Sequence, residues 1–159
     1  MIKIQIPATS ANLGAGFDAL GLALTYYNYI EMEECDKIDI TAADGLDIPT
    51  DERNLIYISA KDLFAVCGKK LEGLKLIQTS NIPMARGLGS SSACIIAGLV
   101  GANKMLGDPL TKDDLVDLAA QIEGHPDNTA PALLGGIVTA VFDGRKVHLS
   151  LIHISEPTR

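Results

Sequence analysis

Apolar and polar side chains alternate at the start of the chain, which is the pattern of a strand with one buried face. Ile2, Ile4 and Ile6 share that face, and the small, turn-forming residues of 8–16 follow as a predicted loop. Residues 21–34 are apolar and rich in Tyr, and they predict one or two further strands. We expect these early strands to be antiparallel and joined by short links. Other predicted strands cover residues 37–41, 74–79 and 136–142.

A spacing of three or four residues between apolar positions predicts helices farther along the chain. Gly68 suits the C-terminal cap of the first helix, and Thr111 with Asp114 resembles a capping box for the third. Strands that come first and helices that come later, within one core, indicate an α+β domain with a sheet covered on one side. The predicted helices cover residues 56–67, the stretch from 93 to about 106, and residues 112–123.

Composition places the chain among folded, globular proteins, because 47% of its 159 residues are hydrophobic and 21% are charged. Thirteen Lys and Arg against twenty Asp and Glu leave a net charge of −7, which argues against binding to nucleic acid or to a membrane surface. Three widely spaced cysteines without a CxxC pair indicate neither a disulfide framework nor a zinc site. The pattern contains no signal peptide and no membrane-spanning stretch, so we expect a cytoplasmic protein.

The segment Arg86-Gly-Leu-Gly-Ser-Ser-Ser-Ala93 lies between a predicted strand and a predicted helix, where a phosphate group can bind. Glycines let the backbone approach a ligand closely, and the first N–H groups of a helix are unpaired and partly positive. The segment lacks the GxxxxGKS/T pattern, so backbone amides and serines would hold the phosphate. Taken alone, an ordinary Gly-Ser turn is an equally good interpretation. In a chain of net charge −7, Arg86 beside a helix N-terminus favours the phosphate.

A second cluster packs two carboxylates, an imidazole and an amide into Glu123-Gly-His-Pro-Asp-Asn128, just after the third predicted helix. The helix dipole opposes a carboxylate at a helix C-terminus by ~0.3–1 kcal/mol, and a bound cation would offset this cost. Mg²⁺ prefers one or two carboxylates together with phosphate oxygens, so Glu123 is a candidate ligand. The alternative, which composition alone favours, is a turn at Asp127 and Asn128 with an ordinary surface His125.

The third cluster is the segment Pro7-Ala-Thr-Ser-Ala-Asn-Leu-Gly-Ala-Gly-Phe-Asp18. Its polar side chains Asn12 and Asp18 could orient a small polar substrate. A turn-rich surface loop is the alternative interpretation. A loop of about ten small residues after a strand is more often functional than a plain connector.

Three segments in this order, Pro7–Leu24, Pro83–Ala93 and Glu123–Gly136, resemble the bacterial homoserine kinases of the GHMP kinase superfamily. The GLGSSSA loop is typical of the whole superfamily, whereas the SANLGAGFD and EGHPDN motifs point to homoserine kinases within it. The resemblance implies a GHMP kinase N-terminal ATP-binding domain over residues 1–148, with a fold that resembles the ribosomal protein S5 domain 2-like fold. Its sheet would be mixed and mostly antiparallel, with helices packed on one side.

The same resemblance implies transfer of the γ-phosphoryl group of ATP to the side-chain hydroxyl of L-homoserine, with Mg²⁺, in threonine biosynthesis. Ser91 and Glu123 would be the Mg²⁺ ligands. Asp18 is the candidate catalytic base, and catalysis by positioning without a base stays open. The residues implied to hold homoserine are Asn12, Asp18, His125 and Asn128. The residues implied to bind ATP are Asn54, Pro83, Met84, Ala85, Arg86, Gly87, Leu88, Gly89, Ser90, Ser91, Ser92 and Ala93.

The chain departs from the homoserine kinases because the C-terminal GHMP domain is missing, and we therefore expect residues 1–159 alone to be inactive. Residues 149–159 are identical to the in-frame translation of a transposon-type sequencing adapter, so we expect them to be a non-native tail. A genuine final strand is the alternative interpretation of this tail. The full-length family member is expected to be a homodimer.

Two other functions stay open at this point. Another small-molecule GHMP kinase, of the mevalonate type, would share the phosphate loop. A non-catalytic nucleotide-binding module would need residues 87–92 but would have no use for the four side chains implied to hold homoserine. Their joint presence favours an enzyme.

Overall fold

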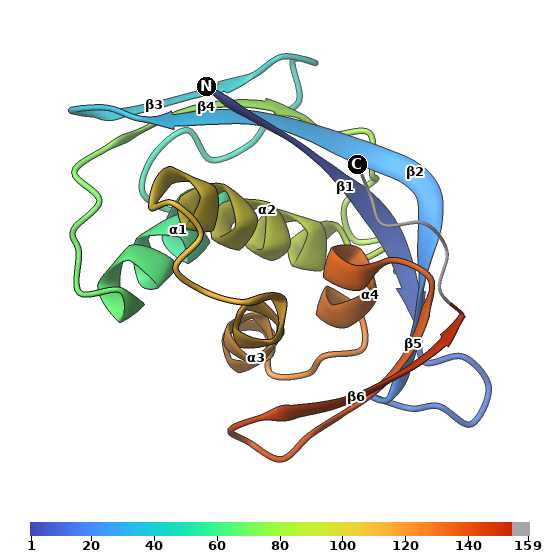
Figure 1. The fold of residues 1–159 in the computed structure, drawn as a ribbon. Helices are drawn as coiled ribbons and strands as arrows, with labels where there is room; N and C mark the ends of the chain where they lie inside the picture. Colours follow the sequence, from blue (N-terminus) through green and yellow to red (C-terminus); the bar gives the residue numbers. More distant parts are fainter. Residues whose placement is uncertain (154–159) are drawn as a thin grey trace.

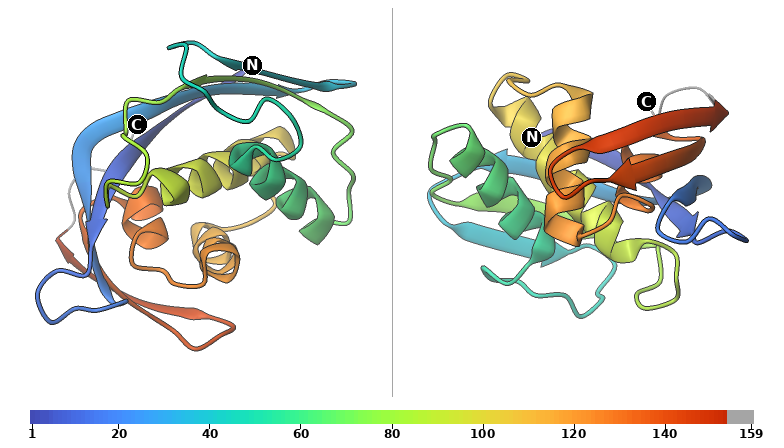
Figure 2. Two further views of the ribbon diagram at one scale, coloured as in Figure 1. Left: turned by 180° about the vertical axis from the view of Figure 1, so that it is seen from behind. Right: turned by 90° about the horizontal axis from the view of Figure 1, so that it is seen from below.

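The computed structural model describes residues 1–153, which form a six-stranded sheet that curves around four helices (Figures 1 and 2). The expected α+β fold, with helices on one face of the sheet, is confirmed. The strands are β1 (Ile2–Ala11), β2 (Leu20–Glu34), β3 (Ile38–Ala42), β4 (Leu74–Thr79), β5 (Ile137–Phe142) and β6 (Val147–His153). The helices are α1 (Leu55–Val66), α2 (Ser90–Met105), α3 (Lys112–Glu123) and α4 (Thr129–Leu134).

Strand β2 organises the sheet because both of its edges are paired. One edge pairs with β1, and the other pairs with β4 over residues 29–34 and with β5 over residues 20–22, always antiparallel. The expectation that all early strands are antiparallel is wrong for β3, which runs parallel to β4. Parallel neighbours need a crossover connection, and α1 supplies it between β3 and β4.

The first strand continues past the point where the sequence predicts a loop. Pairing between β1 and β2 shifts from Pro7 with Tyr27 to Thr9 with Ala23, so one residue of β1 faces three of β2. Such a bulge bends the pair, and β2 visibly turns along the edge of the molecule (Figure 1). Residues 8–11 therefore belong to β1, and the expected loop begins only at Asn12.

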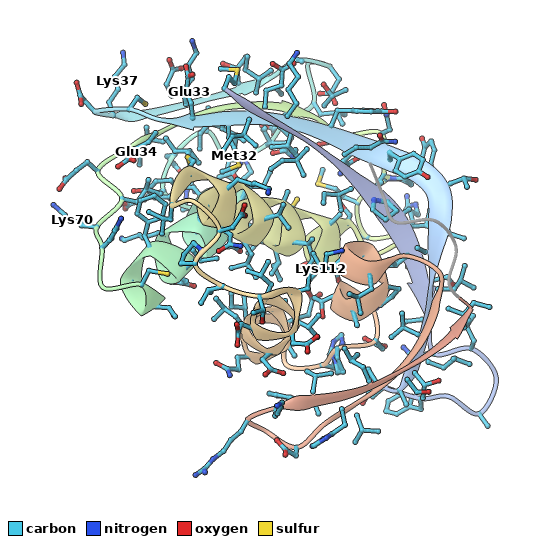
Figure 3. The ribbon with its side chains drawn as sticks, viewed as in Figure 1. Met32, Glu33, Glu34, Lys37, Lys70 and Lys112 are labelled. Carbon is cyan, nitrogen blue, oxygen red and sulfur yellow. The ribbon has the colours of Figure 1, made fainter. Side chains whose placement is uncertain are left out.

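The core lies between the concave face of the sheet and the helices. Met32 on β2 is fully buried and points towards α2, while its neighbour Glu33 points to the opposite face (Figure 3). A Cβ atom on Gly101 of α2 would lie 2.0 Å from the Met32 sulfur, so this helix packs closely against the sheet. A smaller apolar cluster fills the space between α3 and the β5–β6 hairpin.

The first and third helices begin where the sequence predicts, because polar side chains cap them. Thr111 and Asp114 form the expected capping box of α3. Helix α2 begins at Ser90, earlier than expected, which places three serines in its first turn. Helix α4 is not predicted from the sequence: six residues are too few to show a period, and Pro131 stands in the first turn, where no backbone donor is needed.

The end of the described chain pairs with the preceding strand. Residues 149–153 continue β6, and their backbone pairs with β5. The expectation of a non-native tail over residues 149–159 stays a prediction, and residues 154–159 lie outside the described part of the chain. Across residues 1–153, no helix combines the length and the apolar character that a membrane crossing requires.

Candidate active site

The segment between β4 and α2, residues 80–89, is anchored at its start to β2. The Asn28 side chain accepts a hydrogen bond from the Ile82 amide at 2.8 Å. The Asn81 side chain donates to the Tyr27 carbonyl, also at 2.8 Å. Residues 83–87, by contrast, are exposed. This loop, called the phosphate loop below, is therefore held at one end and open to a ligand in its middle.

Helix α2 begins without a side-chain cap. Its N-cap residue is Gly89, which has a φ angle of 65° and no side chain to accept from the first turn, and that turn contains no acidic residue. The unpaired N–H groups of a helix start carry partial positive charge and favour an anion. The exposed Arg86 lies three residues earlier and adds a full positive charge. This end of α2 therefore suits a phosphate group.

Gly89 also has no room for a side chain. A Cβ atom at this position would lie 1.9 Å from the Thr9 hydroxyl oxygen and 3.3 Å from the Asn128 side-chain oxygen. The Thr9 hydroxyl donates to that Asn128 oxygen at 2.7 Å, and the Thr9 amide donates to the Leu88 carbonyl at 3.1 Å. Thr9 thus joins β1, the phosphate loop and the turn before α4.

A hollow of about 290 Å³ lies beside the phosphate loop, between the starts of α1 and α2, and is called the α1–α2 hollow below. Its walls include the apolar side chains of Ile48, Leu55 and Met84, and it reaches Ser91 in the first turn of α2. Asn54 lines it, but its side chain caps α1: its oxygen accepts from the Ile56 amide, and its nitrogen donates to the Pro49 carbonyl. Asn54 therefore shapes this hollow.

Glu123, the last residue of α3, lies beside the serines that open α2. Burial raises the pKa of its carboxyl group above the ordinary value of 4.5, and the nearby hydroxyls of Ser92 and Ser91 only partly oppose this rise. One carboxylate oxygen, Oε2, is buried and has no hydrogen-bond partner. A buried, unpaired carboxylate oxygen costs free energy that a bound cation would offset.

The residues around Glu123 fit a magnesium ion that also binds phosphate. Among residues 1–153, no group of three or more His, Cys, Asp or Glu side chains is placed to hold a metal by itself. Mg²⁺ does not need such a group, because it keeps several waters and takes phosphate oxygens as ligands. Glu123 and Ser91 place two side-chain oxygens next to the phosphate loop that could serve as ligands, in keeping with this preference.

A second hollow, of about 390 Å³, is lined by Asp18 and by His125, which follows Glu123 by two residues. It is called the Asp18–His125 hollow below. The His125 Nδ1 atom lies 2.5 Å from the Asp127 carboxylate, which is buried and has a second oxygen, Oδ2, without a partner. Because Asp127 engages Nδ1, the other ring nitrogen of His125 is free for a ligand.

The loop after β1 presents Asp18 through an unusual backbone. Asn12 and Asp18 have positive φ angles of 59° and 51°, a conformation that asparagine and aspartate adopt more readily than other non-glycine residues. The Asn12 side chain accepts a hydrogen bond from the Asp18 amide at 2.8 Å. Asn12 therefore fixes the loop that carries Asp18, and Asp18 itself is exposed at the edge of the hollow.

A third hollow, of about 340 Å³, lies along the unpaired edge of β1. Its lining is mostly apolar but also includes Lys3, Lys104 and Lys112. Lys112 is labelled in Figure 3. No carboxylate lines it, and Lys3 and Lys104 are paired with surface carboxylates. It therefore offers no metal ligand and none of the residues that the sequence motifs single out.

Of the seventeen predicted site residues, seven line the α1–α2 hollow or the Asp18–His125 hollow, and the other ten, among them Asn12, Arg86, Glu123 and Asn128, line neither. Ser91 lies beside Glu123, Asp18 shares a hollow with His125, and Asn128 touches the phosphate loop. Asn12 lines neither hollow, and the Arg86 guanidinium is exposed and donates only to the Ala85 carbonyl at 3.3 Å. The predicted residues that line the α1–α2 hollow are Asn54, Met84, Ala85, Ser90 and Ser91.

Three residues of the site are missed by reasoning from sequence. Thr9 lies in a stretch predicted as a functional loop, but it is not among the candidate site residues there, and nothing local shows that it reaches Asn128. Asp127 is interpreted there only as a turn residue, although a carboxylate two positions after a histidine is a signal of pairing. Gln78, on β4, lines the α1–α2 hollow and gives no local signal at all.

The model of the GHMP kinase N-terminal domain matches residues 54–136, which is more than half of the chain. The chain belongs to the GHMP kinase family. Within this family, the expected resemblance to homoserine kinases is confirmed. A homoserine kinase from Carboxydothermus hydrogenoformans is 48% identical over 159 residues, which cover 98% of this chain and 52% of that protein. The chain thus spans about half the length of the curated relatives that it matches.

Solved structures of GHMP kinases share the fold. A homoserine kinase from Cytophaga hutchinsonii superimposes with a TM-score of 0.80 at 32% identity, over 92% of this chain and 50% of that one. A mevalonate kinase from Methanococcus jannaschii gives a TM-score of 0.72 at 18% identity, over 96% of this chain and 56% of that one. At that identity the second match shows the fold alone. The mixed, mostly antiparallel sheet with helices is therefore that of a GHMP kinase N-terminal domain.

Substitution of Gly89 by Ala should destabilise this GHMP kinase domain more than the same change at Gly87. Both glycines have positive φ angles, of 65° and 68°, but a Cβ atom on Gly87 meets nothing within 4 Å. Gly87→Ala should therefore cost only about 1–2 kcal/mol, the cost of placing a residue with a Cβ atom in the left-handed backbone conformation. Gly89→Ala should cost at least about 1 kcal/mol more, because the new methyl group displaces Thr9. Urea denaturation measures the free energy of unfolding of both variants. Equal losses of stability in the two variants would contradict the close contact between Gly89 and Thr9.

Substitution of Glu123 by Gln should stabilise the domain at neutral pH and leave its stability unchanged in acid. A carboxyl group whose pKa is raised by folding stabilises fully below its ordinary value of 4.5, and loses this contribution as the pH rises through the raised pKa. Gln resembles the neutral acid at every pH. Thermal unfolding of Glu123→Gln should match the wild type near pH 4 and exceed it near pH 7. The exposed Glu72→Gln serves as control and should change little at either pH.

Proposed function

We propose that the protein containing these residues is an ATP-dependent kinase that phosphorylates the side-chain hydroxyl of L-homoserine. The observation that carries the proposal is the order of groups across the site. The α1–α2 hollow leads to Ser91 at the start of α2, Ser91 lies beside Glu123, and His125, two residues after Glu123, lines the Asp18–His125 hollow. A nucleotide and an acceptor bound in the two hollows would meet at the phosphate loop.

The reaction transfers the γ-phosphoryl group of ATP. A bond forms between the homoserine hydroxyl oxygen and the γ-phosphorus, the bond from that phosphorus to the β–γ bridging oxygen breaks, and ADP leaves. The hydroxyl proton passes to Asp18 or to solvent. Such transfer depends mostly on positioning and on neutralising phosphate charge. The uncapped start of α2 and Arg86 supply positive charge, and Mg²⁺ held by Ser91 and Glu123 would supply more.

Homoserine is proposed as the acceptor because of the polar groups around the Asp18–His125 hollow. Homoserine carries an ammonium group, a carboxylate and a hydroxyl group. Asp18 is an exposed carboxylate suited to the ammonium or the hydroxyl, and His125, whose Nδ1–H faces the Asp127 carboxylate, offers its Nε2 atom as an acceptor for either group. The Asn128 side-chain oxygen accepts from the Thr9 hydroxyl, and its amide nitrogen donates one N–H to the Asp127 carboxylate at 3.4 Å, which leaves the second N–H for the acceptor. Named relatives that are homoserine kinases support this choice.

Other parts of the proposal follow from the family alone. Curated relatives extend well beyond this chain, so the complete site is proposed to include groups from outside these residues. A role in threonine biosynthesis, a cytoplasmic location and a homodimeric full-length protein are proposed on the same basis. The shared fold with mevalonate kinases makes mevalonate the acceptor to compare.

Release of ADP by the full-length protein that contains residues 1–148 tests the proposal. We expect release that depends on both homoserine and Mg²⁺, with no stimulation by mevalonate or galactose. Glu123→Gln should lower kcat by about 100-fold or more, because it removes charge that holds the metal at the phosphates. The exposed Glu72→Gln should keep wild-type kcat.

The alternatives predict different results in this assay. Stimulation of ADP release by mevalonate, but not by homoserine, would show that mevalonate is the acceptor. Tight binding of Mg-ATP without transfer to any of the three acceptors would favour a nucleotide-binding module over a kinase.

A further inference from the structure

Gln78 is the residue of the α1–α2 hollow whose polar side chain is left incompletely paired. It is the fifth residue of β4, only 5% of its surface is exposed, and it lines the hollow. Its side-chain nitrogen donates to the Ser80 hydroxyl oxygen at 2.7 Å and lies 4.0 Å from the Cys94 sulfur. Its oxygen, Oε1, is buried and accepts from no group of the described chain.

A buried amide oxygen without a donor needs an explanation, since most buried acceptors in folded proteins are paired. The other polar groups of the hollow do not supply the donor. The Asn54 side chain bonds to the Ile56 amide and the Pro49 carbonyl, and Arg53 is engaged by the Asp51 carboxylate. A ligand in the hollow can supply the missing donor.

The residues that line the hollow indicate which part of a ligand would bind there. Its walls are largely apolar and suit the faces of a flat heteroaromatic ring, and Gln78, one of its lining residues, has an unpaired acceptor oxygen. Ser90 and Ser91 line the same hollow and begin α2, so the phosphates of the same molecule would lie at the phosphate loop. A nucleobase that fits must therefore present an N–H group to Gln78.

We propose that Gln78 determines the choice of nucleobase by accepting a hydrogen bond from the exocyclic amine of adenine. Hypoxanthine carries a carbonyl oxygen where adenine carries this amine. With hypoxanthine bound, that oxygen and Gln78 Oε1 would be two acceptors facing each other, and Oε1 would stay unpaired. Guanine carries the same carbonyl. This inference rests on the proposed use of ATP, and it adds the residue that distinguishes ATP from ITP and GTP.

Competition binding of ADP and IDP to the full-length protein tests this inference without any acceptor substrate. The wild type should bind ADP at least about tenfold more tightly than IDP, since a polar site that loses its partner rejects the analogue. Gln78→Leu should weaken ADP binding, leave IDP binding nearly unchanged and bring the two affinities within about threefold. Equal affinities in the wild type, or a preference for IDP, would overturn the inference.

Two controls separate the possible failures. Gln5→Leu makes the same chemical change on β1, outside the α1–α2 hollow, and should keep the wild-type preference for ADP. Thermal unfolding verifies that Gln78→Leu is folded, and the wild-type comparison of ADP with IDP decides the matter even where that variant does not fold. Preference for ADP without homoserine-dependent ADP release would retain the role of Gln78 and reject the proposed acceptor. Homoserine-dependent ADP release with equal use of ATP and ITP would retain the proposed acceptor and reject the role of Gln78.

Discussion

The close contact between Thr9 and Gly89 is the constraint on which the rest of the site depends. Through one residue of β1, the sheet meets the phosphate loop and the turn that carries His125 and Asn128, three segments that lie far apart in the sequence. The β2 bulge, where three residues of β2 face one of β1, lies directly before Thr9 and bends the strand pair there. Because Gly89 has no side chain, α2 can begin against the sheet with its first N–H groups uncapped. The sheet therefore positions the start of α2 where phosphate would bind.

Buried polar atoms without partners gather around this point. Within residues 1–153 they include Glu123 Oε2, Asp127 Oδ2 and Gln78 Oε1. Each such atom costs about 1–3 kcal/mol in a folded protein. The proposed ligands would offset this cost: a cation at Glu123, an acceptor beside His125 and a base at Gln78. On this proposal, the empty domain gives up some stability so that the site can bind Mg-nucleotide and substrate.

Local sequence patterns predict the elements whose signals are local, and they fail where distant segments decide. The cap at Thr111 and the alternation over residues 74–79 gave correct bounds for α3 and β4, because capping and period act within a few residues. The length of β1 and the parallel direction of β3 depend on partners elsewhere in the chain. The three motifs marked the phosphate loop, Glu123 and Asp18, since residue type and spacing carry that chemistry. Thr9 and Gln78 acquire their roles only through the folded sheet, so no local pattern indicates them.

The central claim is that nucleotide binds with its base in the α1–α2 hollow and its phosphates at the start of α2, near Glu123. Amide chemical-shift mapping of the ¹⁵N-labelled protein, titrated with ADP and Mg²⁺, tests it most directly. The account predicts the largest shifts at residues 84–92 and around Gln78 and Glu123, with a strong dependence on Mg²⁺ at Ser91. It predicts little change along the hollow at the edge of β1. Shifts concentrated around Lys3, Lys104 and Lys112, with the phosphate loop unchanged, would contradict it.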